Sequence, residues 1–187
     1  RPLLKLFTQI TCGIILLVTG SEITLSYVNI INYVITIVWV VGIMNSLNML
    51  DNMDAISTTV SISIILCALT VMLFHQEYNS VYFIIMLGVM ASLSGFLFFN
   101  WHPSKMYMGD TGSQFLGVFL AAMGIRYLWN AEPPSGDLIS ARNLFLPLIV
   151  FLMPIIDTTT VVINRLSKGK SPFVGGKDHT THALAYL

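Results

Sequence analysis

Uncharged, mostly apolar runs occupy much of the chain, and they predict its architecture. No Asp, Glu, Lys or Arg occurs in Leu6–Ser21, Ile23–Leu50, Ala55–Gln76 or Tyr78–Ser104. A helix that crosses a membrane needs roughly 20 mostly apolar residues, and its backbone groups must hydrogen bond within the segment. The pattern therefore predicts an all-α, polytopic transmembrane helix bundle. We expect about six spans, near residues 3–20, 28–47, 55–74, 80–99, 112–130 and 143–164.

Successive spans would sort the connecting segments onto two faces of the membrane. One face receives Ser21–Tyr27, His75–Asn79 and Ala131–Arg142. The other receives Arg1–Lys5, Met49–Asp54, Asn100–Asp110 and the tail from Arg165. Of the nine Lys and Arg residues, seven fall on the second face and two on the first. Because Lys and Arg accumulate in cytoplasmic loops, the second face is predicted to be cytoplasmic.

The composition agrees with a membrane protein. Of the 187 residues 10% are charged, and the mean hydropathy is +0.78, whereas soluble domains carry about 25% charged residues. The formal net charge of zero gives no sign of nucleic-acid binding. Cys12 and Cys67 lie inside apolar runs without metal-ligand spacing, and we interpret them as small core residues. Residues 1–187 are expected to form a single integral membrane domain that belongs to a longer chain.

A first polar motif stands where the second span leaves the membrane. Asn45, Asn48 and Asp51 recur at helical spacing and can therefore share one face, and Asp54 follows three residues later. Two carboxylates at this spacing can hold a cation or contact a ligand rich in hydrogen-bond donors. Asn and Asp are also good helix caps, so the motif alone leaves both interpretations open.

A second motif leads into the fifth predicted span. Gly109 and Gly112 allow the backbone to approach a ligand closely, and Thr111 and Ser113 supply hydroxyls. The helix that follows offers free N–H groups to a phosphate. Asp110 suits Mg²⁺, which prefers a few carboxylates together with phosphate oxygens. The alternative is that Asp110 or Thr111 merely caps the helix.

The tail beyond the last predicted span is basic and contains two histidines. Its basic side chains could clamp a diphosphate, although the same residues also supply the topology signal; they are Arg165, Lys168, Lys170 and Lys177. His179 and His182 could donate to phosphates, act as acid–base groups or bind a metal. His75 and His102 show no such grouping, and we interpret them as interfacial residues.

Together these segments resemble the polyprenyl-phosphate N-acetylhexosamine-1-phosphate transferase family. The family pattern Asn-x-x-Asn-x-x-Asp-Gly-x-Asp-Gly falls on residues 45–55, with Asn52 and Ala55 in place of its two glycines. Its Gly-Asp-x-Gly-Ser signature falls on residues 109–113, after Asn100 and Pro103. Further matches are Pro154, Asp157, Thr158 and Arg165, and a terminal His-x-His-His pattern at 179–182, in which Thr181 replaces the middle histidine.

The resemblance implies transfer of a sugar-1-phosphate from a UDP-N-acetylhexosamine to polyprenyl (undecaprenyl) phosphate, with release of UMP. It implies Mg²⁺, or Mn²⁺ in its place, as cofactor, and the cytoplasmic face of a bacterial plasma membrane as the location; a homodimer is compatible with it. The implied catalytic residues are Asp51, Asp54, Asp110, His179 and His182, with Asp110 and Asp51 as metal ligands. The implied substrate contacts are Asn45, Asn48, Gly109, Thr111, Gly112, Ser113, Arg165 and Lys177.

Two further expectations concern the rest of the chain and the rival functions. The family's paired aspartates would precede Arg1 and more helices would follow Leu187, so residues 1–187 alone are expected to be inactive. An ion-coupled transporter subunit stays open as an alternative, because acidic groups near spans often mark ion pathways. A non-catalytic homologue of the same fold also stays open, and metal-dependent turnover would distinguish it from the enzyme.

Overall fold

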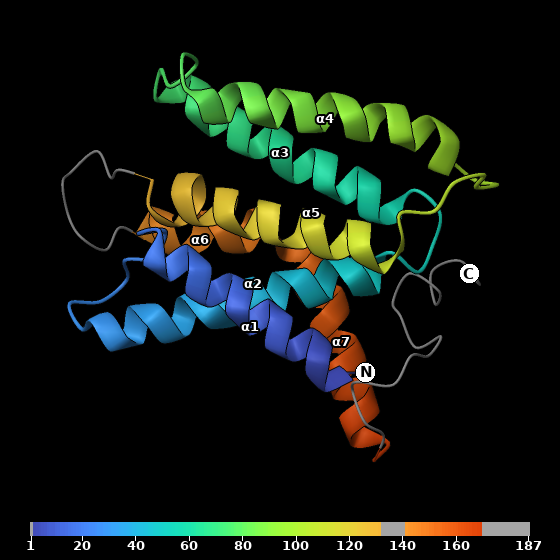
Figure 1. Cartoon of the computed structure of the whole chain (residues 1–187), viewed down its shortest axis with the longest axis horizontal. Helices are drawn as coiled ribbons and strands as arrows, with labels where there is room; N and C mark the ends of the chain where they lie inside the picture. The colour runs from blue at the N-terminus through green and yellow to red at the C-terminus, as the bar shows by residue number, and fades with distance from the viewer. Residues whose placement is uncertain (1, 132–140, 170–187) are drawn as a thin grey trace.

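A computed structural model describes residues 2–131 and 141–169, and in these ranges every regular element is a helix. The elements in chain order are α1 (Pro2–Val18), α2 (Asn29–Leu50), α3 (Ile56–Phe74), α4 (Val81–Asn100), α5 (Gly109–Gly124), the π-helix η1 (Ile125–Trp129), α6 (Ala141–Val150) and α7 (Leu152–Ser167). Figure 1 shows α1 to α5 running lengthwise through the molecule, with α7 turned away from them. The prediction of an all-α bundle is confirmed.

The expected spans all fall on helices, but the number of helices that can cross a membrane alone is smaller than six. By length and composition three described helices meet this condition, namely α2, α3 and α4, or four if α6 and α7 form one broken span. The first span is a shorter apolar helix, and α5 has 16 residues before it continues into η1. Only 11% of the apolar window of α4 is buried, as expected of a helix that faces lipid.

The last predicted span is not one straight helix, so the prediction of a continuous helix over 143–164 is wrong. The chain breaks at Phe151, and α6 and α7 are bent by 72° relative to one another. Pro154 has no N–H to donate to the carbonyl of Val150, and its ring clashes with that carbonyl. Val150 is the residue at which α6 ends. Backbone bonds from Phe151 N to Pro147 O (2.9 Å) and from Ile155 N to Phe151 O (3.1 Å) bridge the bend.

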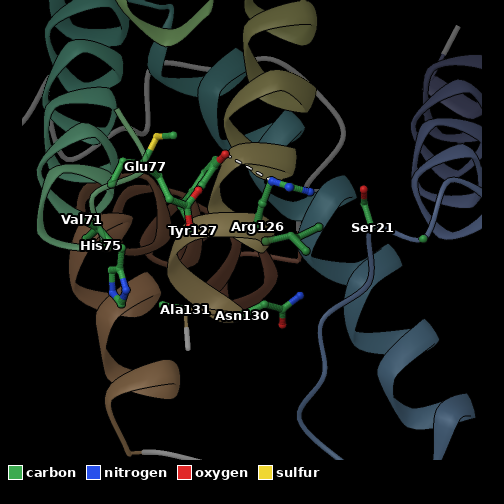
Figure 2. Close-up of a pocket in the computed structure, with 11 residues that line it drawn as sticks. Ser21, Val71, His75, Glu77, Arg126, Tyr127, Asn130 and Ala131 are labelled. Atoms are coloured by element: carbon green, nitrogen blue, oxygen red, sulfur yellow. Dashed lines mark hydrogen bonds between the residues drawn. The ribbon is translucent and has the colours of Figure 1, made fainter. Parts of the chain in front are cut away.

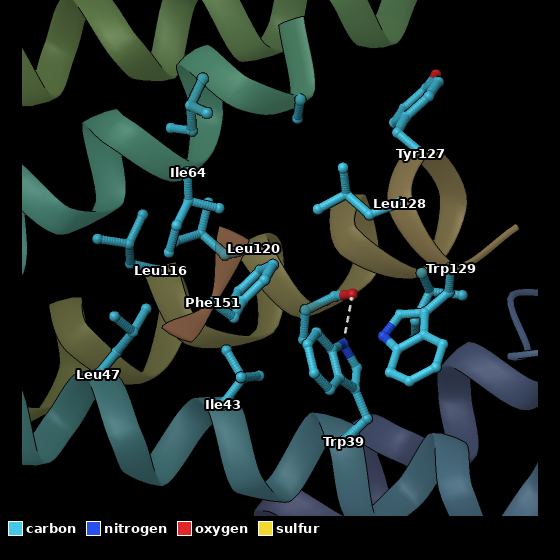
Figure 3. Packing of buried hydrophobic residues seen from close by; sticks show 14 of the residues in the cluster. Trp39, Ile43, Leu47, Ile64, Leu116, Leu120, Tyr127, Leu128, Trp129 and Phe151 are labelled. Atoms are coloured by element: carbon cyan, nitrogen blue, oxygen red, sulfur yellow. Dashed lines mark hydrogen bonds between the residues drawn. The ribbon is translucent and has the colours of Figure 1, made fainter. Parts of the chain in front are cut away.

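An aromatic cluster fixes this bend to the centre of the bundle (Figure 3). The Trp39 ring of α2 meets Phe151 and Trp129 edge-on, with ring centroids 4.9 Å and 5.3 Å apart. Edge-to-face pairs of this kind add to the stabilisation that burial provides. The Trp39 indole N–H also donates to the Ala121 carbonyl of α5 at 3.2 Å. The core therefore lies where α2, α5, η1 and the bend meet.

Helices α2 and α5 approach each other closely at a glycine. A Cβ atom added to Gly117 would lie only 2.7 Å from Cα of Met44. A helix contact this close requires a residue without a side chain. Because α2 and α5 also carry the two polar motifs at one of their ends, the Gly117 contact sets the relative position of those motifs.

Candidate active site

The two polar motifs lie at the same end of the bundle. The connections α2–α3 and α4–α5 are adjacent at this end, and the N-terminal half of α1 reaches it as well (Figure 1). Asn45 and Asn48 belong to the last two turns of α2, and Asp51 directly follows that helix. Gly109 and Asp110 open the first turn of α5. The structure thus brings together residues that are more than 60 positions apart in the sequence.

Asn48 is the polar side chain that joins these helices. Its amide nitrogen donates to Oδ1 of Asp110 at 3.0 Å and to Oγ of Ser113 at 2.9 Å. Its amide oxygen accepts a hydrogen bond from the ammonium group of Lys5 in α1. Ser113 is buried and donates in turn to the Gly109 carbonyl at 3.0 Å. Asn48 therefore orients the Asp110 carboxylate and also links it to Lys5, because its amide group bonds both side chains.

One turn deeper in the bundle, Asn45 has an internal partner. The amides of Asn45 and Gln9 exchange two hydrogen bonds, of 3.0 Å and 2.9 Å. Gln9 is 1% exposed and also donates to Oε1 of Gln114 at 2.8 Å. The structure gives Asn45 a role in joining α1, α2 and α5 beneath the site. The sequence signal for this network was Gln9, the single Gln in a first span that is otherwise mostly apolar.

Asp51 is half-buried beyond the end of α2 and lies close enough to Asp110 for the two charges to interact. Its Oδ1 accepts from Ser57 Oγ at 2.8 Å, and the backbone N–H of Gly109 also bonds it. Burial raises the pKa of Asp51, the bonds from Ser57 and Gly109 oppose that rise, and the charge of Asp110 adds to it. Two neighbouring carboxylates of which one is partly desolvated are expected to bind a divalent cation, because the cation removes their repulsion.

These two carboxylates are the acidic ligands that the described residues offer to a metal. No group of three or more His, Cys, Asp or Glu side chains in the described ranges is arranged to hold an ion. Mg²⁺ commonly binds through one or two carboxylates and takes its other ligands from water and substrate phosphates. The pair Asp51 and Asp110 fits that requirement, since Asp110 is exposed and open to a substrate.

Asp54 has a different set of partners from Asp51. Its Oδ2 lies 2.9 Å from Nδ1 of His102 and accepts from the Ser104 backbone N–H at 3.1 Å. The sequence showed no grouping for His102, and the structure supplies its partner, which lies 48 positions away in the sequence. Within the described ranges no hydrogen bond joins Asp54 to Asp51 or Asp110. Asp54 fixes the α4–α5 connection against the α2–α3 connection.

Asn100 makes a second link between the same two connections. It is 3% exposed, and its Oδ1 accepts from Ala55 N at 3.0 Å and from Thr58 Oγ1 at 3.1 Å. Its amide nitrogen donates to the Met106 carbonyl at 2.9 Å. Ala55 has φ +65°, a left-handed conformation that glycine adopts without a steric penalty. This conformation gives a physical reason for glycine at the corresponding place in the resembling family's motif.

The backbone at the start of α5 has no side-chain cap. Its N-cap position is Met108, and no side chain makes a capping hydrogen bond there, so the capping alternative for Asp110 and Thr111 is wrong. Gly109 has φ +70° and nothing within 4 Å of an added Cβ, which leaves its backbone open to a ligand. A Cβ on Gly112 would lie 2.7 Å from Cγ of Met108. Thr111 is exposed and takes no part in the Asn48 network.

The remaining predicted residues belong to the C-terminal part of the chain. Arg165 lies in the last turn of α7 and is 4% exposed, and Asp157 on the same helix is fully buried. Both have interaction partners in the fold. Lys177, His179 and His182 lie outside the described residues, so their placement in the site stays a prediction.

Comparison with known proteins shows where similar sequences occur. The family model described as glycosyl transferase family 4 matches residues 1–128. A Bacillus subtilis protein named "Probable undecaprenyl-phosphate N-acetylglucosaminyl 1-phosphate transferase" is 36% identical over 98 residues, which is 52% of this chain and 25% of that protein. Decaprenyl-phosphate N-acetylglucosaminephosphotransferase of Mycolicibacterium smegmatis is 30% identical over 133 residues, 65% of this chain and 32% of that one.

A relative from a second branch is also similar. Phospho-N-acetylmuramoyl-pentapeptide-transferase of Carboxydothermus hydrogenoformans is 37% identical over 81 residues, covering 43% of this chain and 21% of that protein. The matched segments thus span between about a fifth and a third of the length of these three curated relatives.

Proposed function

Because this chain belongs to glycosyl transferase family 4, we propose that it transfers N-acetylhexosamine-1-phosphate from a UDP-sugar to polyprenyl phosphate. The names of its relatives support this proposal, since they combine undecaprenyl or decaprenyl phosphate with an N-acetylglucosaminyl 1-phosphate transferase or an N-acetylglucosaminephosphotransferase. The observation that carries it is the hydrogen bond by which Asn48 holds Asp110, beside Asp51, at the N-terminus of α5. No described contact favours an ion-coupled transporter.

We place the site at the cytoplasmic face of a bacterial plasma membrane, in a multi-pass protein. The seven-to-two distribution of Lys and Arg supports this orientation. The polyprenyl acceptor resides in the bilayer, so its phosphate group meets the protein at headgroup depth. Asp51 and Asp110, which we call the acidic cluster, lie at the end of α2 and the start of α5, where such a phosphate can reach them.

The chemical difficulty is the approach of two anions. Repulsion between unit charges about 4 Å apart costs about 4 kcal/mol at an effective dielectric constant of about 20. Asp51 and Asp110 would hold Mg²⁺, or Mn²⁺ in its place, and the bound cation supplies positive charge that offsets this repulsion. Lys5 places a further positive charge beside the same site, because its ammonium group donates to Asn48.

The protein's own groups would bind and orient the phosphates. The N–H groups that follow Gly109 in the first turn of α5 would bind phosphate oxygens, since the N–H of Gly109 itself bonds Asp51. Asn48 keeps the Asp110 carboxylate in one orientation. Asp54 and Asn100 hold the two connections in register around the site. Arg165, Lys177, His179 and His182 are the further phosphate contacts that we propose from the family resemblance.

The transfer exchanges one phosphoanhydride for another. In the net reaction an oxygen of the acceptor phosphate becomes bonded to the β-phosphorus of the UDP-sugar, and the bond between that phosphorus and the oxygen bridging to the α-phosphate breaks. The electron pair of the broken bond leaves with UMP, and the sugar keeps its bond to the transferred phosphate. A glycosyl transfer would instead break the bond at the sugar C1 carbon and release UDP.

The nucleotide product tests the proposal. The intact protein is incubated with UDP-N-acetylglucosamine labelled in the β-phosphate, polyprenyl phosphate and Mg²⁺, and the products are separated by chromatography. We expect UMP in the nucleotide fraction and the label in the lipid. Asp110→Asn should lower turnover by about a hundredfold or more, since a neutral amide is a poor ligand for Mg²⁺.

A carboxylate at the other end of the bundle provides the matched control. Glu22→Gln removes the same charge from the connection between α1 and α2 and should leave turnover unchanged. Release of UDP with an unlabelled lipid would refute the reaction class. Turnover that is independent of divalent metal, or normal turnover by Asp110→Asn, would refute the assigned metal site.

A further inference from the structure

A second site lies at the end of the bundle opposite the acidic cluster. It is a pocket of about 360 Å³, and Figure 2 shows the side chains around it. They come from the connection after α1, from the end of α3 and the turn that follows, and from η1. The polar residues that line the pocket are Ser21, His75, Glu77, Arg126, Tyr127 and Asn130. The proposed transfer reaction uses none of them.

Arg126 is the feature of this pocket that most needs an explanation. It is the one charged residue between Asp110 and Glu132 and lies near the end of the span expected over 112–130. Charged residues in such segments are costly and usually mark a functional site. Arg126 also belongs to the π-helix η1, and π-helical turns occur frequently at functional sites. Its side chain is exposed, although Ile125 and Tyr127 on either side are buried.

The structure holds the Arg126 guanidinium in place without using most of its donors. The group stacks over the Tyr82 ring at 4.4 Å from the centroid, and its Nε donates to the Tyr127 hydroxyl at 3.3 Å, the dashed line in Figure 2. Within the described ranges its two terminal nitrogens make no hydrogen bond. They therefore remain available for an acceptor, and a paired N–H fork of this kind matches a phosphate group.

Neighbouring groups also favour an anion. Nη2 of Arg142 lies 3.2 Å from Nε2 of His75, and because a guanidinium only donates, this imidazole nitrogen accepts. The proton of the neutral ring then resides on Nδ1, which is free to donate. Arg126 and the exposed Glu77 are the charged residues among the described ones that line the pocket, and of these Arg126 offers N–H donors to an anion.

We propose that this pocket binds the phosphate of an anionic phospholipid from the leaflet opposite the candidate active site. A lipid is favoured over free phosphate because the half-buried Val71 lines the pocket and the exposed apolar side chains of Phe74 and Val81 lie at the same end of the bundle. Tyr82 and Tyr127 next to Arg126 are residues typical of the membrane interface. The site goes beyond the proposed transfer reaction and does not depend on it.

Lipid binding by the intact protein tests this site directly. The protein is purified in detergent, and native mass spectrometry measures its affinity for phosphatidylglycerol and phosphatidylcholine. We expect about tenfold tighter binding of phosphatidylglycerol, and about a tenfold loss of that affinity in Arg126→Gln, as for one hydrogen bond to a charged group. Lys105→Gln is the matched control, because it removes the same charge from an exposed residue at the other end of the bundle that does not line the pocket.

Two further variants keep the test decisive if Arg126→Gln does not fold. Ser21→Phe fills the pocket while it retains Arg126 and should also lower phosphatidylglycerol affinity, whereas Arg126→Lys keeps the charge and should retain part of it. Equal losses in Arg126→Gln and Lys105→Gln would reduce the effect to general surface charge and overturn the site. Equal affinity for the two lipids, or displacement of the lipid by millimolar inorganic phosphate, would overturn the assigned ligand.

Discussion

Replacing Gly117 by alanine tests whether the close approach of α2 and α5 positions the candidate active site. An added Cβ would lie 2.7 Å from Met44 Cα and 3.3 Å from Met44 Cγ. Carbon atoms in contact prefer separations of about 3.5–4.0 Å, so the two backbones would have to separate by about 1 Å. Such overpacking typically costs about 1–3 kcal/mol of stability.

The consequence for the site follows from helical spacing. Asn48 lies one turn beyond Met44 on α2, and Ser113 lies one turn before Gly117 on α5. The Asn48–Ser113 hydrogen bond of 2.9 Å is thus the next contact along the same pair of antiparallel helices. A displacement of about 1 Å would stretch it beyond hydrogen-bonding distance. A misplacement of this size at a catalytic site can lower the rate by about a hundredfold.

The assay compares UMP release and thermal unfolding of the intact protein for Gly117→Ala and Gly42→Ala. Gly42 lies in the middle of α2 and has nothing within 4 Å of an added Cβ, so alanine there should be neutral or stabilise the helix slightly. We expect about a hundredfold lower turnover and a lower unfolding temperature for Gly117→Ala alone. Normal turnover of Gly117→Ala at an unchanged unfolding temperature would refute the positioning role of this contact.

Two further predictions concern the protonation of Asp51 and the orientation of the bundle. Burial raises the pKa of Asp51, so in the metal-free protein the charged form of this side chain disfavours folding. The stability of the fold is therefore highest below the ordinary aspartate pKa and falls as the pH rises through the raised pKa. Asp51→Asn should remove this fall in a pH series of unfolding temperatures, and an unchanged pH dependence would contradict the burial argument. In a background without Cys12 and Cys67, a cysteine at Ser104 should resist an impermeant thiol reagent applied from outside the cell, whereas one at the exposed Thr24 should react. The reverse labelling pattern would place the acidic cluster on the outer face.

The sequence was sufficient to predict the class of fold and the grouping of the first two motifs. Long uncharged runs in lipid have helices as their stable form, because the backbone must satisfy its own hydrogen bonds. Alternation of helix direction then carries Asn48 and Asp110 to the same end of the bundle, although 62 residues separate them. The bend at Phe151 was not predicted, although Pro154 removes a backbone hydrogen bond from the continuous helix that the apolar pattern favoured.

The tertiary structure decided which polar groups meet. Periodicity places a residue on a helix face, but it does not fix the rotation or depth of one helix against another. The contact of Gly117 with Met44 sets that register, and it gives Asp110 the Asn48 amide as its partner. The pairing of His102 with Asp54 joins two connections that have no periodic pattern of their own. For the same reason the pocket around Arg126 could not be foreseen, because its walls come from three separate segments that only the packing of the bundle brings together.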